Sequence, residues 1–596
     1  MSLRARACAR ARRVVHNRQI FFTALTLCVL WIFMVTLGPN SRWSRAALSF
    51  FPGSRRVPKR MPTYPPILPP LEDRVTCYGP RDQFLSRSPD DELKEVQLDV
   101  AYPLPWVGSY ETLGLPTTWM TLDGRYGPYG YGEDRAGYGR KKVDWDRIDW
   151  GDLQNKCFER NAHRFPESAR KLDNMLDTIR FGYRNITQIP EVRHWHEFKD
   201  TRRTAILVRA WEGYEYKQED MVYLRSLIVE TSLRTGAEYH VILLVNIKDM
   251  DRKIFSSPES YTQALKDAGI PQELQSIAVL WDDHLLASWY PDVPEHRTMW
   301  QVYQPVQLFA LHYPEFDHFW QVELDMRFTG DAGVYLDRLS EFARNEPRKQ
   351  ALERATFQHM QSLIGDYDTF FAAVDEVNKG GSWAWGPVHV PEIEPVGPAP
   401  PTKLPQEEDF QWGRGEEADV IVTSLCNNAS AATSWVFRDW IGGFGQGMQT
   451  PRFFCPPAIT RQSRSLLFVA HEAQLGQGLR VPSEATPASF ALWHGLKLSY
   501  PPQPVFWRDP NDIDYQLGWW KGGPRNSSTG IGPDSIDHPR GDGLSFWWES
   551  SWPRQVFDAW DGKPLEEGVH FPWILTKEED GRVYIPNMMM HPMKHR

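Results

Sequence analysis

Between residues 204 and 325 the sequence alternates between short runs with strand character and longer runs with the apolar spacing of helices. The predicted strands are TAILVRAW (204–211), EYHVILLVNI (238–247), SIAVLWDD (276–283) and HFWQVELD (318–325). Helical patterns at 221–236, 258–269 and 299–313 lie between them. Short connections between such elements require right-handed crossovers and a mostly parallel sheet with helices on both faces. The sequence therefore predicts an α/β fold whose ligands bind beyond the carboxyl ends of the strands.

The chain of 596 residues is too long for one hydrophobic core, and its composition changes along its length. After residue 510 the sequence is rich in Gly, Pro and Trp and gives no clear periodicity. We predict a cytosolic tail (1–19), a transmembrane anchor (20–37), a Pro- and Arg-rich stem (38–70), an irregular N-terminal layer (71–199), the α/β domain (200–510) and a C-terminal extension (511–596).

The amino-terminal region predicts attachment to a membrane. Residues 20–37 form a run of 18 residues without a charged side chain, and this is about the length needed to cross a bilayer. Six Arg residues precede the run. A secretory signal peptide is the alternative, but no small-residue cleavage site follows at once. Basic residues on the amino-terminal side favour a cytosolic amino terminus, although basic residues also follow the run. We expect a single-pass type II protein of the secretory pathway, located in the Golgi, with a lumenal body.

Cysteines and glycosylation sequons fit a lumenal body. Four cysteines follow the anchor, and of their three possible pairings the simplest joins Cys77 to Cys157 and Cys426 to Cys455. Sequons begin at Asn185, Asn428 and Asn526. The net charge of −9 argues against a nucleic-acid partner.

The last predicted strand ends in two acids, Glu323 and Asp325, separated by one residue. Side chains two apart on a strand point to the same side, so the two carboxylates repel each other unless a positive group lies between them. Mn²⁺ or Mg²⁺ prefers such oxygen ligands and shares them with substrate phosphates. The pair therefore predicts a metal site that bridges to phosphate. The alternative is a pair that caps turn amides or contacts Arg327.

The segment HFWQVELDMRF (318–328) resembles the YWRVEPxVxF signature of fungal GT-A-type α-1,2-mannosyltransferases, with Leu324 in place of the Pro. A wider set of segments resembles a fungal family of single-pass proteins of unknown function in the glycosyltransferase clan. These segments, between about Cys77 and Pro510, are LVRAWEGYEY, YLRSLIVETSL, YHVILLVNIKD, FWQVELDMR, WAWGP, EEADVIVTS and LWHGLK. The resemblance implies a GT-A-like, Rossmann-related fold and a glycosyl-transfer reaction, but no particular substrate.

The resemblance also implies nucleotide contacts at the end of the first strand. There Arg209 would contact phosphate or ribose, and Trp211 or Tyr214 would stack on the base. A structural Arg paired with a neighbouring acid is the alternative. Asp282 and Asp283 end the third strand, and Asp283 would touch the nucleotide there. The alternative, a cap at the start of the following helix, is the favoured interpretation of this pair.

Three later residues complete the predicted site. In GT-A enzymes a late His often completes the metal shell, so the resemblance implies this role for His494 in WHGLK (493–497). Lys497 would neutralise the departing diphosphate. Asp419 would act as a catalytic base toward the acceptor. For each residue a structural role is the alternative: a loop His, a solvated Lys and a turn acid.

The sequence thus predicts a transferase that moves a sugar from a nucleotide-sugar donor to a glycan or glycoprotein acceptor with Mn²⁺ or Mg²⁺. A first alternative is a metal-independent glycoside hydrolase that uses Glu323 and Asp325 as its acid/base pair. A second is a non-catalytic carbohydrate-binding protein on the same scaffold.

Overall fold

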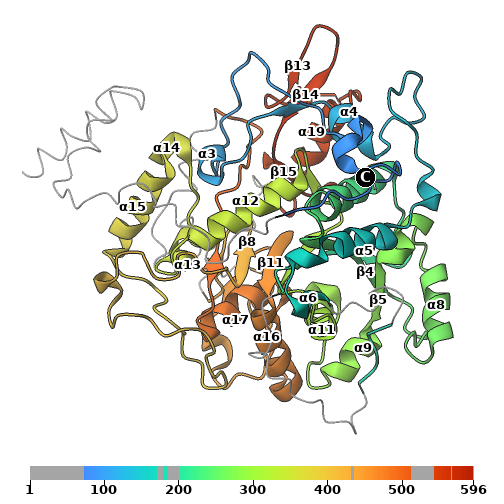
Figure 1. Cartoon of the computed structure of the whole chain (residues 1–596). Helices are drawn as coiled ribbons and strands as arrows, with labels where there is room; N and C mark the ends of the chain where they lie inside the picture. The colour runs from blue at the N-terminus through green and yellow to red at the C-terminus, as the bar shows by residue number, and fades with distance from the viewer. Residues whose placement is uncertain are drawn as a thin grey trace, which may run out of the picture. The chain divides into compact units, whose positions relative to one another are not determined.

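A seven-stranded sheet forms the centre of the protein (Figure 1). The computed structural model describes residues 73–170, 179–184, 201–430, 432, 435–511, 543–565 and 567–594. Within this part, the strand order is β12-β8-β11-β6-β3-β4-β5. The strands are β3 (Thr204–Trp211), β4 (Tyr239–Ile247), β5 (Ala278–Asp282), β6 (His318–Glu323), β8 (Val420–Val422), β11 (Ile459–Ser463) and β12 (Leu498–Ser499).

Strands β3 to β6 are parallel to one another, as the alternating pattern predicted. Strand β11 runs antiparallel to both of its neighbours, β6 and β8, whereas β12 runs parallel to β8. Strands β8 and β12 therefore point in the same direction as β6. The prediction of a mostly parallel sheet is confirmed, and the bounds of β3 agree with the predicted ones.

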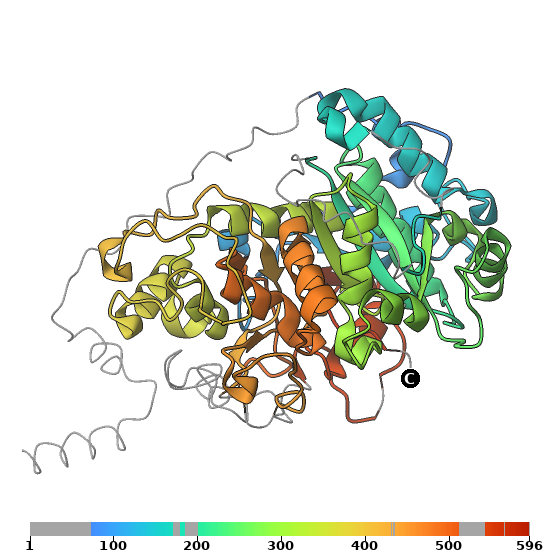
Figure 2. The same ribbon diagram turned by 90° about the horizontal axis from the view of Figure 1, so that it is seen from below.

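Helices cover both faces of the sheet (Figure 2). On one face Ile206 and Val208 of β3 pack in a core with residues of α7 (Gln218–Leu227) and α12 (Ala332–Asn345). On the other face Ala205 and Leu207 pack with α9 (Asp283–Trp289), α11 (Gln304–His312) and α16 (Arg464–Gln477). This division follows from the period of two in a strand, which sends successive side chains to opposite faces.

The predicted helices are present with local differences. The pattern at 221–236 forms α7 followed by a π-helical segment, Ile228–Leu233. The pattern at 299–313 forms α10 (Thr298–Gln301) and α11, with Pro305 near the start of α11. The other helices are α3 (Tyr110–Leu113), α4 (Leu122–Tyr126), α5 (Trp150–Asn161), α6 (Glu167–Arg170), α8 (Pro258–Asp267), α13 (Ala351–Thr356), α14 (Gln361–Ile364), α15 (Tyr367–Asn378), α17 (Thr486–His494) and α19 (Trp552–Trp560).

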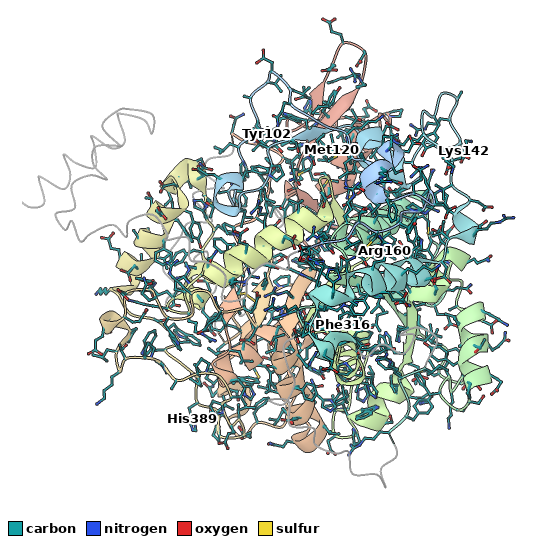
Figure 3. All side chains as sticks on the ribbon, viewed as in Figure 1. Tyr102, Met120, Lys142, Arg160, Phe316 and His389 are labelled. Atoms are coloured by element: carbon teal, nitrogen blue, oxygen red, sulfur yellow. A yellow bond between two sulfur atoms is a disulfide. The ribbon has the colours of Figure 1, made fainter. Side chains whose placement is uncertain are left out.

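Segments from the two ends of the described chain share a small sheet of four strands. Its order is β1 (Glu95–Val96), β2 (Trp119–Met120), β14 (Val583–Pro586) and β13 (Thr576–Lys577). Tyr102 and Met120, both labelled in Figure 3, bind the C-terminal segment: the Tyr102 hydroxyl accepts from the Asn587 N–H at 2.8 Å, and the Met120 carbonyl accepts from Trp560 Nε1 at 3.0 Å. The remaining strands in the described part of the chain form two sheets of two strands each. One pairs β9 (Asn427–Asn428) with β10 (Phe453–Phe454), and the other pairs β7 (Arg327–Phe328) with β15 (Met589–Met590).

Both predicted disulfides are present, Cys77–Cys157 and Cys426–Cys455. The predicted tail, anchor and stem lie outside the described residues, as do the sequons at Asn185 and Asn526. In the part of the chain that the structure describes, no helix combines the length and the apolar character of a membrane span.

A buried ion pair joins the N-terminal layer to the central domain. Arg125 pairs with Glu230 through its two terminal guanidinium nitrogens, and neither side chain is exposed to solvent. The Tyr129 hydroxyl donates to the same carboxylate at 2.7 Å, and the Ala332 N–H donates to it at 2.7 Å. Because the partners are desolvated, removal of one charge leaves the other buried without compensation.

We predict that Glu230→Gln destabilises the protein by about 3–5 kcal/mol, since it leaves the Arg125 charge unpaired in the interior. The measurement is the Tm from scanning fluorimetry. The matched control is Glu341→Gln, which removes one partner of the half-exposed Arg338–Glu341 pair on α12 and is expected to change stability by less than about 1 kcal/mol. Equal Tm changes in the two variants would contradict the prediction.

Candidate functional site

A cavity of about 620 Å³ lies at the carboxyl ends of the parallel strands. Strand β3 supplies Arg209 and Trp211 to its wall, and β4 supplies Asn246. Glu323 closes β6, and Asp325 follows it in the turn toward β7. The volume is that of a small-molecule site, and this edge of the sheet is where open α/β folds bind ligands.

The two acids meet an imidazole from the far C-terminal segment. His591 Nε2 lies 2.8 Å from Glu323 Oε2 and 3.5 Å from Asp325 Oδ1. His591 is buried, whereas about a fifth of each acid side chain is exposed to the cavity side. Among the described residues, these three form a group of potential metal ligands whose donor atoms lie within 4.8 Å of one another.

Backbone pairing fixes the position of His591. Strand β15 pairs antiparallel with β7, which brings residue 591 beside the turn that follows β6. The His591 N–H donates to the Ser545 carbonyl at 3.1 Å, and the Trp547 N–H donates to the His591 carbonyl at 2.9 Å. Two residues later, the Met593 N–H donates to the Asp325 carbonyl at 2.7 Å. Main-chain hydrogen bonds on both sides therefore hold the backbone of residue 591 beside the two acids.

The charges of the cluster favour ionised acids and a protonated imidazole. Burial disfavours the charged form of Glu323, but the ion pair with Arg209 and the hydrogen bond from His591 outweigh it and lower the pKa of Glu323. Burial acts in the same way on Asp325, yet His591 and Lys594 lower the pKa of Asp325 to about 2. Burial disfavours the imidazolium, but the two carboxylates raise the pKa of His591 to about 9. The metal-free cluster is thus stabilised by a proton on His591.

In the presence of a chelator, we predict a pH-dependent contribution of His591 to stability. Because its folded pKa of about 9 lies above the ordinary value near 6.5, the contribution is complete below about pH 6.5 and is lost as the pH rises through about 9. The measurement is the Tm of the wild type and of His591→Gln from pH 6 to pH 10. The Tm difference should be largest at pH 6 and shrink by pH 10; a constant difference would contradict the assignment.

The structure brings five of the sequence-predicted site residues to this one cavity. They are Arg209, Trp211, Tyr214, Glu323 and Asp325. Arg209 pairs with Glu323. The predicted alternative for Arg209, a structural Arg paired with a neighbouring acid, therefore describes the metal-free protein. Tyr214 contacts the Trp211 ring edge-on, with the ring centroids 4.7 Å apart, and Lys248 Nζ lies 5.2 Å from the same ring.

Asp283 does not line the cavity; it is the first residue of α9. Its neighbour Asp282 is the N-cap of this helix, because its carboxylate accepts from the Leu285 N–H at 2.6 Å. The capping alternative therefore describes this pair better than a nucleotide contact. From the same strand, β5, Trp281 faces the cavity instead.

The structure does not bring Asp419, Lys497 and His494 to this cavity. Asp419 accepts from the Ser463 hydroxyl at 2.7 Å, and Ser463 pairs with His318 at the start of β6. Lys497 donates its backbone N–H to Asp419 at 2.8 Å. Asp419 and Lys497 thus lie at the amino edge of the sheet, about 16 Å along β6 from Glu323.

Strand direction is the physical reason for this separation. Because β8 and β12 run parallel to β6, the residues that precede them lie at the edge opposite the acids. Lys497 donates from Nζ to the carbonyls of Arg344, Gly413 and Glu416. His494 is buried at the end of α17, where burial lowers its pKa to about 4. Asp419 and Lys497 thus bind groups at the edge opposite the acids, and His494 does not line the large cavity.

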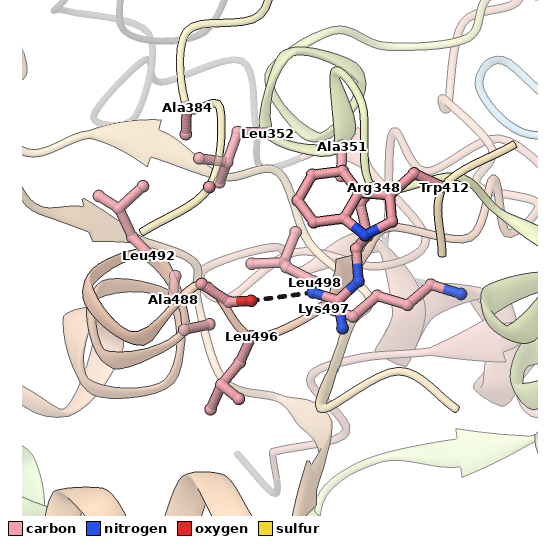
Figure 4. A pocket seen from close by; sticks show the side chains of 13 residues that line it. Arg348, Ala351, Leu352, Ala384, Trp412, Ala488, Leu492, Leu496, Lys497 and Leu498 are labelled. Atoms are coloured by element: carbon pink, nitrogen blue, oxygen red, sulfur yellow. Dashed lines mark hydrogen bonds between the residues drawn. The ribbon is translucent and has the colours of Figure 1, made fainter. Parts of the chain in front are cut away.

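A second, small cavity lies beside Lys497 (Figure 4). Its volume is about 50 Å³, and its walls include Leu352, Leu492 and Leu498 with Arg348 beside Trp412. The space suits one or two water molecules and is too small for a nucleotide or a sugar. The large cavity at the carboxyl edge is therefore the candidate site.

Sequence reasoning missed His591, Lys594 and Asn246. The segment NMMMHPMKHR at the C-terminus shows no spacing that links it to an acid pair more than 260 residues earlier. Its one signal is a histidine in an otherwise apolar run. Asn246 lies next to the last residue of an apolar strand, at the edge of the sheet where ligands are predicted to bind. A polar residue at that position is the signal from which a site residue could have been predicted.

The fold and the site define an α/β protein in which two carboxylates on the wall of a large cavity contact a buried imidazole. The chain belongs to the family described as protein of unknown function (DUF3405), which matches residues 121–595. The matched range includes both acids and the C-terminal histidine. No curated protein matches the sequence.

Proposed function

We propose that the protein is a metal-dependent glycosyltransferase that uses a nucleotide-sugar donor. The observation that carries the proposal is the convergence of Glu323 and Asp325, on the wall of a cavity large enough for such a donor, with the buried His591 behind them. The resemblance of residues 318–328 to a GT-A signature supports the same reaction class. Its GT-A-like fold is supported by the mostly parallel sheet and by the acids at the carboxyl end of β6.

The donor set suits a divalent cation. Two carboxylate oxygens and one imidazole nitrogen fit Mn²⁺ better than Mg²⁺, because Mg²⁺ prefers oxygen ligands alone. The ion would supply positive charge to the departing diphosphate. Arg209 holds Glu323 through its other oxygen, which leaves the carboxylate oriented toward His591.

Other residues of the cavity suit the rest of the donor. Lys594 and Lys248 place ammonium groups on its wall, where they would attract the diphosphate. Trp211 is 39% exposed and offers an aromatic surface to the base. The acceptor would be a glycan or glycoprotein. The two disulfides support an oxidising compartment, and together with the predicted anchor at residues 20–37 they support the Golgi lumen.

The hydrolase alternative is less well supported. A glycosidase requires one carboxylic acid that is protonated and donates to the leaving group, with a raised pKa. Here the pKa values of both Glu323 and Asp325 are lowered, and both acids contact the same imidazole. A non-catalytic binding protein would use the same cavity, so transfer activity has to be measured directly.

We predict that Glu323→Gln, Asp325→Asn and His591→Gln each weaken Mn²⁺ binding by at least about tenfold, because each removes a ligand. The measurement is calorimetry with Mn²⁺ on the purified full-length chain. The matched control is His494→Gln, the same chemical change at a buried histidine outside the site, which should leave affinity unchanged. Unaltered affinity in the three site variants would overturn the metal assignment.

A panel of UDP- and GDP-sugars tests the reaction. We predict that the wild type binds at least one donor only with Mn²⁺ and releases its nucleoside diphosphate when acceptor glycans are added, whereas Glu323→Gln does not. Glycoside cleavage in the presence of chelator would favour the hydrolase. Metal-dependent binding without product would favour the non-catalytic alternative.

A further inference from the structure

Three side chains form a row across neighbouring strands on the floor of the cavity. Trp211 of β3 is in register with Asn246 of β4, and Asn246 is in register with Trp281 of β5. Residues in register on adjacent strands point to the same face of a sheet. The three side chains all line the cavity, so one amide lies between two indoles.

The amide of Asn246 has an unsatisfied donor. Its Nδ2 is buried, and no acceptor for it exists among the described residues. A buried donor without a partner costs about 1–3 kcal/mol, and most such groups in folded proteins are satisfied. Because Asn246 lines the cavity, a rotation of its amide would present this donor to a bound ligand, which would supply the missing acceptor.

The indoles on either side limit what that ligand is. Trp281 is 4% exposed and forms part of the floor, whereas Trp211 is 39% exposed and is fixed by Tyr214 at its edge. Flat aromatic surfaces around one amide suit a planar heterocycle that carries hydrogen-bonding groups on its edge. A sugar or phosphate alone would leave the indoles without a planar partner.

The distance to the acids fits the same ligand. Glu323 is in register with Arg209 of β3, and Arg209 is in register with Leu244 of β4, two residues before Asn246. Two strand spacings and two residue rises therefore place Asn246 about 12 Å from Glu323. In a nucleotide the ribose joins the diphosphate to the base. If the diphosphate lies beside the acids, the base therefore lies one ribose farther away. The amide is therefore placed for the base and not for the diphosphate.

We infer that Asn246 recognises the edge of the donor's base, with Nδ2 donating to a ring carbonyl and Oδ1 accepting from the adjacent ring N–H. Uracil (O4 and N3–H) and guanine (O6 and N1–H) both present this edge. The inference rests on the proposed function and deepens it, because it assigns the base contact of the donor to one residue of this chain.

Asn246→Asp separates the two bases. An aspartate accepts two hydrogen bonds and donates none, so it pairs with the N1–H and N2–H of guanine but opposes the O4 of uracil. We predict that the ratio of Kd for UDP to Kd for GDP, measured by calorimetry with Mn²⁺ on the full-length chain, rises at least about tenfold in this variant. Asn246→Leu should weaken both nucleotides by at least about tenfold.

Two controls make the outcomes distinct. Asn511→Asp adds the same charge at an exposed position and should leave the ratio unchanged. Inorganic pyrophosphate with Mn²⁺ should bind Asn246→Asp as it binds the wild type, which excludes loss of fold. A ratio that stays within twofold of the wild type while pyrophosphate still binds overturns the role of Asn246 and leaves the transferase proposal intact. If the wild type binds neither nucleotide with Mn²⁺, the proposed function and this inference both fail.

Discussion

The contact between His591 and the two acids is the interaction on which the site depends. Glu323 and Asp325 follow the same strand and face the same side, and two ionised carboxylates so placed require a positive partner. The chain supplies one from its far end, since β15 pairs with β7 and places the imidazole 2.8 Å from Glu323. The C-terminal segment, which has little regular structure, is thus part of the site.

The same segment ties the outer layers of the protein together. Strand β14 pairs with β2 of the N-terminal layer, and Arg125 of that layer is buried against Glu230 of the central domain. These contacts join residues that are far apart in the sequence, and the Arg125–Glu230 pair is buried away from solvent. The local sequence pattern around each residue therefore does not identify its partner. The position of His591 follows from this arrangement, because the strand before it is held between the central domain and the outer layer.

The elements with a strong local hydrophobic period could be predicted from the sequence. The parts of the site that depend on strand direction, or on contacts between residues far apart in the chain, could not. Strand β3 and the acid pair were found because an apolar run ending in polar residues has a physical meaning at a parallel sheet. Asp419 and Lys497 lie at the opposite edge because β8 and β12 run in the same direction as β6, and the local sequence does not specify strand direction. His591 was missed because contacts over such a separation leave no periodic signal.

The charge balance of the cluster connects its structure to its proposed chemistry. Two carboxylates, the Arg209 guanidinium and a protonated His591 leave the metal-free cluster close to neutral. Exchange of the imidazole proton for a divalent cation would make it positive by one charge, because a metal ligand must be the neutral imidazole. A positive cluster beside Lys594 attracts an anionic diphosphate, whereas the neutral one does so weakly. The pairing that stabilises the metal-free fold would therefore also delay strong donor binding until the metal is present.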